Sequence, residues 1–109
     1  MHYILLGKVI KGEGYGRKIG FPTVNLEVLT NIFPLPGVYA GVAVLNGKEY
    51  RSGIVIGPVG KVEAHLIGYS GNAYGKEVTL KIKKFLRKFK EFKTEKALIA
   101  QIKKDLKAC

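Results

Sequence analysis

The chain has 109 residues, 47% of them hydrophobic, and its 19 Lys and Arg against 8 Asp and Glu give a formal net charge of +11. Its apolar runs are far shorter than the roughly 20 residues that a membrane-spanning helix needs. One cysteine and two histidines exclude an internal disulfide and a Cys/His metal cluster. The positive charge favours an anionic partner, such as nucleic acid, an anionic membrane or a phosphorylated small molecule.

Most of the chain predicts short strands. The first is "YILLGKVIKG", an apolar, β-branched run that ends at glycine. Two strand-like runs flank Asn46-Gly47, a dipeptide typical of a two-residue hairpin turn. "KVEAHLIGY" follows, and "KEVTLKIKKFL" places Val78, Leu80 and Ile82 at alternate positions, as in a strand with one buried face. Five or six such strands predict an antiparallel barrel or sandwich.

A glycine-rich basic segment, "KGEGYGRKIG", follows the first predicted strand. Glycines let backbone N–H groups turn toward an anion, and the basic side chains neutralise its charge. The segment matches neither nucleotide-binding glycine motif, because no helix is expected after it. It predicts either an anion-binding loop or a mobile surface loop.

"FPTVN", residues 21–25, comes next. Pro22 fixes its own φ and favours an extended conformation for Phe21. If the following residues are extended, Thr23 and Asn25 point to one face. Their neutral oxygens could hold a hard cation that keeps its waters and phosphate ligands. The alternative is a local turn in which these side chains cap the backbone.

Glu63 lies in "KVEAHL", where alternation puts it on the face opposite Val62 and Ala64. It is either an outward, solvated residue or, if it faces a pocket, a candidate general base. Further on, "KIKKFLRKFKEFK" interleaves Phe85, Phe89 and Phe92 with basic residues. This pattern suits stacking on bases or a flavin, one face of a basic membrane helix, or core phenylalanines among solvated lysines.

The tail changes period. Leu98, Ile102 and Leu106 recur every four residues, which predicts an amphipathic helix over about 94–108. Thr94 is the expected N-cap. The helix should pack on the barrel or plug it. One domain is therefore predicted over 1–109, with the barrel over about 1–92.

Taken together, the segments resemble the riboflavin kinase family of the ATP-dependent bacterial and eukaryotic type. The residues that carry the resemblance are, in order, "GKVIKGEGYGRKIGFPTVNL", "PGVYAGVAV", "VEAHL", "AYG" and "FLRKFKEFKTEKALIAQIKKD". It implies an all-β fold, a six-stranded antiparallel Greek-key barrel with a C-terminal helix. It also implies transfer of the γ-phosphoryl group of ATP to the 5′-hydroxyl of riboflavin, giving FMN and ADP. The single Cys109 fits a reducing compartment, so a cytoplasmic protein is expected.

The resemblance implies a role for each matching residue. Glu63 would be the catalytic base, and Thr23 and Asn25 would hold Mg²⁺, with Zn²⁺ or Mn²⁺ as other possibilities. The residues implied in nucleotide binding are Gly12, Arg17, Thr23, Leu66 and Tyr74. Those implied in flavin binding are Arg87, Lys90 and Phe92.

The chain departs from the family pattern in the loop over residues 57–61, which is shortened. Nothing in it resembles the His-x-Gly-His motif of an adenylyltransferase, so FAD synthesis is not expected. Small-molecule substrates, a monomer, and no nucleic-acid or membrane partner are expected. Two alternatives stay open: a basic nucleic-acid-binding barrel, and a flavin- or nucleotide-binding relative with impaired catalysis.

Overall fold

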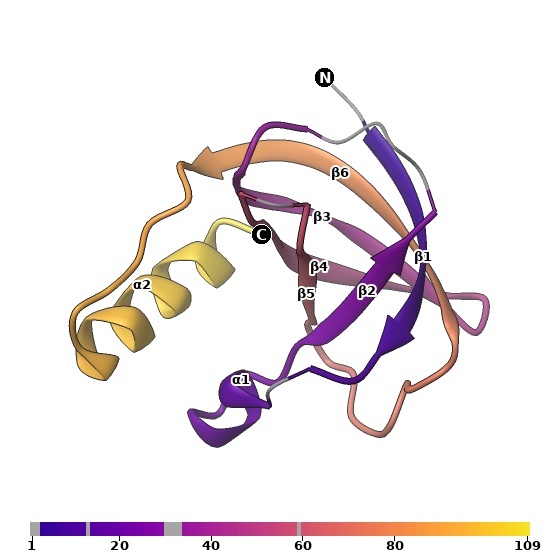
Figure 1. Cartoon of the computed structure of the whole chain (residues 1–109), viewed down its shortest axis with the longest axis horizontal. Helices are drawn as coiled ribbons and strands as arrows, with labels where there is room; N and C mark the ends of the chain where they lie inside the picture. Colours follow the sequence, from indigo (N-terminus) through magenta and orange to yellow (C-terminus); the bar gives the residue numbers. More distant parts are fainter. Residues whose placement is uncertain (1–2, 13, 30–33, 59) are drawn as a thin grey trace.

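The computed structural model describes residues 3–12, 14–29, 34–58 and 60–109. Its elements are, in chain order, β1 (Tyr3–Ile10), α1 (Tyr15–Lys18), β2 (Val24–Val28), β3 (Gly37–Leu45), β4 (Lys48–Ile56), β5 (Val62–Leu66), β6 (Glu77–Arg87) and α2 (Glu95–Lys107). The strands form a closed antiparallel barrel in the order β1-β2-β5-β4-β3-β6, and α2 lies beside it (Figure 1). This architecture confirms the predicted barrel with a C-terminal helix.

The hairpin of β3 and β4 turns at Asn46-Gly47. The strands stay in register from Gly37 opposite Ile56 to Leu45 opposite Lys48. Asn46 and Gly47 have φ values of 54° and 76°, a left-handed conformation that these two residue types tolerate best. The two-residue turn predicted from the sequence is therefore confirmed.

Alternation along the strands fills the barrel interior. Val78, Leu80 and Ile82 of β6 are each at most 2% exposed, as their period of two predicts. β5 alternates in the same way: Val62, Ala64 and Leu66 are buried, and the two residues between them lie on the outer face. The other fully buried large side chains of the core are Leu5, Leu45, Ile54 and Ile56.

The end of β6 is irregular and carries Phe85. The pairing of β6 with β3 shifts register twice, and Phe85 is paired with Tyr39. The two rings meet edge-on with a centroid separation of 5.3 Å. Burial raises the pKa of the Tyr39 phenol, and Tyr3 raises it further. Phe89 and Phe92 follow in the irregular connection to α2, so the interpretation of the three phenylalanines as one helical face is wrong.

α2 begins and ends close to the predicted limits. The Thr94 hydroxyl accepts a hydrogen bond of 3.1 Å from the Ala97 amide, which confirms the predicted N-cap. The helix lies beside the barrel wall instead of plugging it (Figure 1). Its last turn approaches β4, where a Cβ on Gly53 would come within 3.1 Å of Leu106. Among the described residues, no helix is long and apolar enough to cross a membrane.

The glycine-rich basic segment contains one turn of helix, α1, which the sequence did not predict. Its fold-back is closed by the Phe21 amide, which donates to the Gly16 carbonyl at 2.7 Å. A Cβ on Gly16 would overlap the Phe21 carbonyl oxygen, so only glycine permits this close approach. The turn returns the chain to the barrel at the start of β2.

Candidate active site

Two cavities meet at the start of β2. We call them the α1 cavity, of about 1080 Å³, and the α2 cavity, of about 630 Å³. The first lies at the end of the barrel beside α1, and the second lies between the outer barrel wall and α2. The residues that line both are Gly14, Gly16, Thr23 and Asn25.

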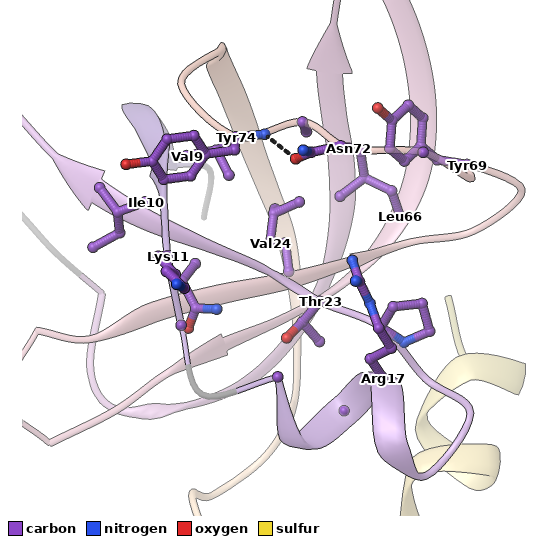
Figure 2. A pocket seen from close by; sticks show the side chains of 18 of the residues that line it. Val9, Ile10, Lys11, Arg17, Thr23, Val24, Leu66, Tyr69, Asn72 and Tyr74 are labelled. Atoms are coloured by element: carbon purple, nitrogen blue, oxygen red, sulfur yellow. Dashed lines mark hydrogen bonds between the residues drawn. The ribbon is translucent and has the colours of Figure 1, made fainter.

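The α1 cavity brings together all five residues that the resemblance implies in nucleotide binding. Leu66 is buried and forms part of the cavity floor, whereas Arg17 and Tyr74 are exposed. Figure 2 shows Arg17 and Tyr74 on opposite sides of the opening. The Tyr74 amide donates to the Asn72 side-chain oxygen at 2.9 Å, which orders the turn that carries the tyrosine.

Thr23 and Asn25 lie at the junction of the cavities. Thr23 immediately precedes β2, and Asn25 lies on it. A Cβ on Gly12 would overlap the Asn25 amide group, so this glycine leaves the space that the asparagine side chain occupies. Within the described ranges, no group of three or more His, Cys, Asp or Glu side chains could hold a metal ion. A cation here would therefore depend on neutral oxygens and on its own phosphate and water ligands.

The α2 cavity contains Glu63 and the three residues that the resemblance implies in flavin binding. Glu63 lies opposite Asn25 in the pairing of β2 with β5, so the carboxylate and the amide are neighbours on the outer face of the barrel. The side chain of Glu63 is 31% exposed, and the Lys61 amine lies 3.5 Å from its carboxylate. Glu63 is thus an outward residue that also faces a cavity.

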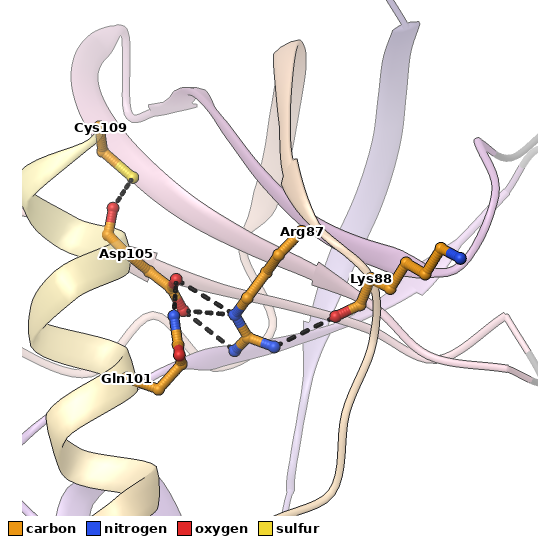
Figure 3. Close-up of polar contacts among 5 residues, drawn as sticks. All are labelled: Arg87, Lys88, Gln101, Asp105 and Cys109. Carbon is orange, nitrogen blue, oxygen red and sulfur yellow. Dashed lines mark hydrogen bonds and ion pairs between the residues drawn. The ribbon is translucent and has the colours of Figure 1, made fainter.

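Arg87 ties the end of β6 to α2. Its Nε donates to both carboxylate oxygens of Asp105 at 3.1 Å, and a terminal nitrogen donates to one of them at 3.0 Å (Figure 3). Gln101 donates to the same carboxylate at 2.8 Å. The Arg87 guanidinium also lies 5.5 Å from the centre of the Phe92 ring, and the Lys90 amine lies 5.3 Å from it. The implied flavin residues therefore form one cluster that is held to the helix.

The C-terminal cysteine is joined to the same helix end. Its thiol donates to the Asp105 carbonyl at 3.4 Å. Burial raises the pKa of the Cys109 thiol, and the Asp105 carboxylate raises it further, while Arg51 acts in the opposite direction. A raised pKa leaves less thiolate at neutral pH, so Cys109 is a poor nucleophile.

Sequence reasoning missed Asp105 and His65. Asp105 is only 9% exposed. In the sequence it lies among lysines near the end of the helix, a pattern that predicts a solvated surface. His65 lines the α2 cavity, and its Nδ1 lies 2.6 Å from the Pro22 carbonyl oxygen. Alternation places His65 on the same face as Glu63, but no signal in the sequence indicates its partner, 43 residues earlier.

The comparisons with known proteins agree with this architecture. The family model described as riboflavin kinase matches residues 1–109. A bifunctional riboflavin kinase/FMN adenylyltransferase of Haemophilus influenzae is 33% identical over 95% of this chain and 36% of its own length. The RNA-binding riboflavin kinase RibR of Bacillus subtilis is 32% identical over 94% of this chain and 48% of its own length.

Two solved structures share the fold. A Streptococcus pneumoniae protein described as a macrolide-efflux protein superimposes with a TM-score of 0.90 at 27% identity, over 95% of this chain and 37% of that one. Riboflavin kinase from Trypanosoma brucei superimposes with a TM-score of 0.69 at 23% identity, over 97% of this chain and 76% of that one. At that identity the second likeness concerns the fold alone.

The protein is thus a small antiparallel barrel with two adjoining cavities, one at the end of the barrel and one between its outer wall and α2. The chain belongs to the riboflavin kinase family, because the family model covers all of it. It spans about a third of the length of the bifunctional relatives that it matches.

Proposed function

We propose that this chain is an ATP:riboflavin 5′-phosphotransferase, which makes FMN and ADP from riboflavin and ATP. One observation carries the proposal. The residues implied in nucleotide binding and those implied in flavin binding line different cavities, and Thr23 and Asn25 line both. Two substrates placed in these cavities would present their reacting ends to each other at this junction, as a direct transfer requires.

The α1 cavity suits a nucleoside triphosphate. Arg17 and Lys11 line it beside the glycines of the segment around α1, so cations and backbone N–H groups are available to neutralise phosphates. Leu66 supplies apolar surface at the floor, and the exposed Tyr74 ring at the rim could stack on the base. Gly12, next to Lys11, would contact the phosphate chain through its backbone.

The α2 cavity suits a flat, largely apolar ring system. Val38 and Val55 line its barrel side, and the apolar stripe of α2, predicted from Leu98, Ile102 and Leu106, lines the other. Its volume lies within the range of small-molecule sites. Phe92 offers a ring for stacking, and Arg87 and Lys90 beside it could attract the phosphate of the product.

The residues at the junction fit a magnesium ion. The Thr23 hydroxyl and the Asn25 amide oxygen would hold it, leaving the remaining positions to water and phosphate oxygens. Bound there, the ion would neutralise the charge that develops on the phosphates. Mn²⁺ or Zn²⁺ could bind to the same two oxygens in place of Mg²⁺.

Glu63 would act as the general base. Its carboxylate would accept the proton of the ribityl 5′-hydroxyl as that oxygen bonds to the γ-phosphorus and the bond to ADP breaks. Arg17 would hold the phosphates in line during the transfer. At the two ends of the loop over 57–61, the Gly57 amide donates to the Lys61 carbonyl at 2.7 Å. The Lys61 amine lies 3.5 Å from the Glu63 carboxylate.

The direct test combines the protein with riboflavin, ATP and Mg²⁺ and follows FMN by chromatography. We expect Mg-dependent formation of FMN. Binding of riboflavin and MgADP without turnover would instead identify a catalytically impaired relative. Steeply salt-dependent binding to single-stranded RNA, with indifference to riboflavin, would identify a nucleic-acid-binding barrel. We also propose a monomer without nucleic-acid or membrane partners, acting in the cytoplasm.

Replacing Gly12 with alanine is expected to weaken the use of magnesium. The added methyl group would displace the Asn25 amide, so the half-saturating Mg²⁺ concentration should rise roughly 10-fold. Titrating Mg²⁺ in the FMN assay measures this. The control is Gly20→Ala, which strains a φ of 92° but whose methyl group would meet open space. An equal effect of both variants would mean that a general disturbance of the segment around α1, and not the displacement of Asn25, is responsible.

A further inference from the structure

His65 makes a hydrogen bond whose direction follows from its partner. Nδ1 lies 2.6 Å from the Pro22 carbonyl oxygen. A carbonyl oxygen only accepts, so Nδ1 carries the hydrogen and donates. In the neutral ring Nε2 then has no hydrogen.

The acceptor belongs to the residue that precedes Thr23. The pairing of β2 with β5 ends with Val24 opposite Ala64, so Thr23 lies one residue beyond the last backbone pair. His65 is the residue next to Ala64 on the partner strand. Its side chain therefore extends the pairing of the two strands by one further link, at the position where the backbone ladder stops.

Phe21 is held in place from two directions. Its amide donates to the Gly16 carbonyl of α1 at 2.7 Å. Its ring meets the His65 ring edge-on, with 6.1 Å between centroids. Pro22 follows Phe21 and has no N–H of its own. Its carbonyl is therefore the polar backbone group through which His65 of β5 can hold Pro22.

We propose that His65 is a positioning residue, which holds Thr23 at the junction of the two cavities through the Pro22 carbonyl. This inference rests on the proposed function, because it assigns Thr23 to the magnesium-bound nucleotide. His65 acts through its Nδ1–H on the protein backbone. A role of Nε2 toward a ligand in the α2 cavity, which His65 also lines, is the competing explanation.

Two amide substitutions separate these explanations. The side-chain N–H₂ introduced by His65→Asn would lie close to the position of Nδ1, whereas the one introduced by His65→Gln would lie close to that of Nε2. Calorimetric titration with ADP, with and without Mg²⁺, measures nucleotide binding apart from turnover. We expect His65→Leu and His65→Gln to weaken MgADP binding about 3- to 10-fold, the loss of one hydrogen bond. His65→Asn should stay within about 2-fold of the unsubstituted protein, and ADP without Mg²⁺ should be nearly unaffected in all three.

The opposite order, with His65→Gln retaining binding and His65→Asn losing it, would overturn the proposal and assign the role to Nε2. Equal binding by all variants would overturn it too. Nitrogen NMR of the histidine ring tests the bond without any ligand: we expect the Nδ1–H tautomer, and an Nε2–H tautomer would contradict it. FMN formation by the unsubstituted protein is measured alongside. If the unsubstituted protein forms no FMN, the proposed function is wrong. If it forms FMN and His65→Leu binds MgADP as tightly as the unsubstituted protein, only this inference is wrong.

Discussion

Replacing Glu63 with glutamine is expected to lower kcat for FMN formation on the order of 10²- to 10⁴-fold. Glutamine keeps the size of the side chain and one acceptor oxygen, but it replaces the other oxygen with an N–H₂ donor and cannot accept the ribityl proton at neutral pH. Riboflavin and MgADP binding should change little, because the base acts in the transition state and not in the substrate complex. Steady-state kinetics, together with riboflavin fluorescence titration, measure both quantities.

Glu27→Gln is the matched control for this experiment. Glu27 lies on β2, two residues beyond Asn25, and is exposed, but it lines neither cavity. Its substitution should leave kcat and both affinities within about 2-fold, as expected for an exposed residue away from the site. A Glu63→Gln protein as active as the unsubstituted one would refute the general-base role of Glu63. It would leave the proposed riboflavin kinase activity itself untouched.

Replacing Asp105 with alanine is expected to lower the free energy of unfolding by about 2–3 kcal/mol and to weaken riboflavin binding. The substitution removes the partner of Arg87, whose side chain is 22% exposed. Breaking a fully buried pair costs about 3–5 kcal/mol, and this exposure moderates the loss. Without the pair, α2 loses its side-chain link to the end of β6, and the helix side of the α2 cavity is held less firmly. Urea unfolding and riboflavin titration measure the two effects.

MgADP affinity shows whether the effect of Asp105→Ala is specific to the flavin site. The α1 cavity contains no residue of α2, so MgADP affinity of Asp105→Ala should stay within about 2-fold. Glu95→Ala removes an exposed acid from the first turn of the same helix and should cost less than about 1 kcal/mol, the size of its interaction with the helix dipole. Unchanged riboflavin affinity in a destabilised Asp105→Ala protein would mean that the helix does not form the flavin site.

The local features of this chain follow from its sequence because each depends on neighbouring residues. The Asn46-Gly47 turn needs two residues that tolerate positive φ, and both are adjacent. The alternation of Val78, Leu80 and Ile82 reports one buried face. Thr94 caps a helix whose first amides lie within three residues of it. The one-turn helix α1 was missed because a fold-back held by the Gly16 carbonyl, and by the room that glycine leaves there, has no periodic signal.

The candidate site divides in the same way. Residue types and spacing in the sequence already indicated Thr23, Asn25 and Glu63 as candidates, and the resemblance to the family implied Arg87. Only the tertiary structure sorted them into two cavities that meet at β2, because the barrel closes β2 against β5, whose pairing places Asn25 opposite Glu63.

The contacts that support these residues came from the tertiary structure as well. Asp105 binds Arg87 from 18 residues away, and His65 reaches the Pro22 carbonyl from 43 residues away. Neither contact produces a periodic pattern in the sequence, because it depends on how the strands and the helix pack and not on neighbouring residues in the chain. The sequence alone therefore determined the fold class and the chemistry available to the site, and the packing of α2 and β5 decided which groups meet.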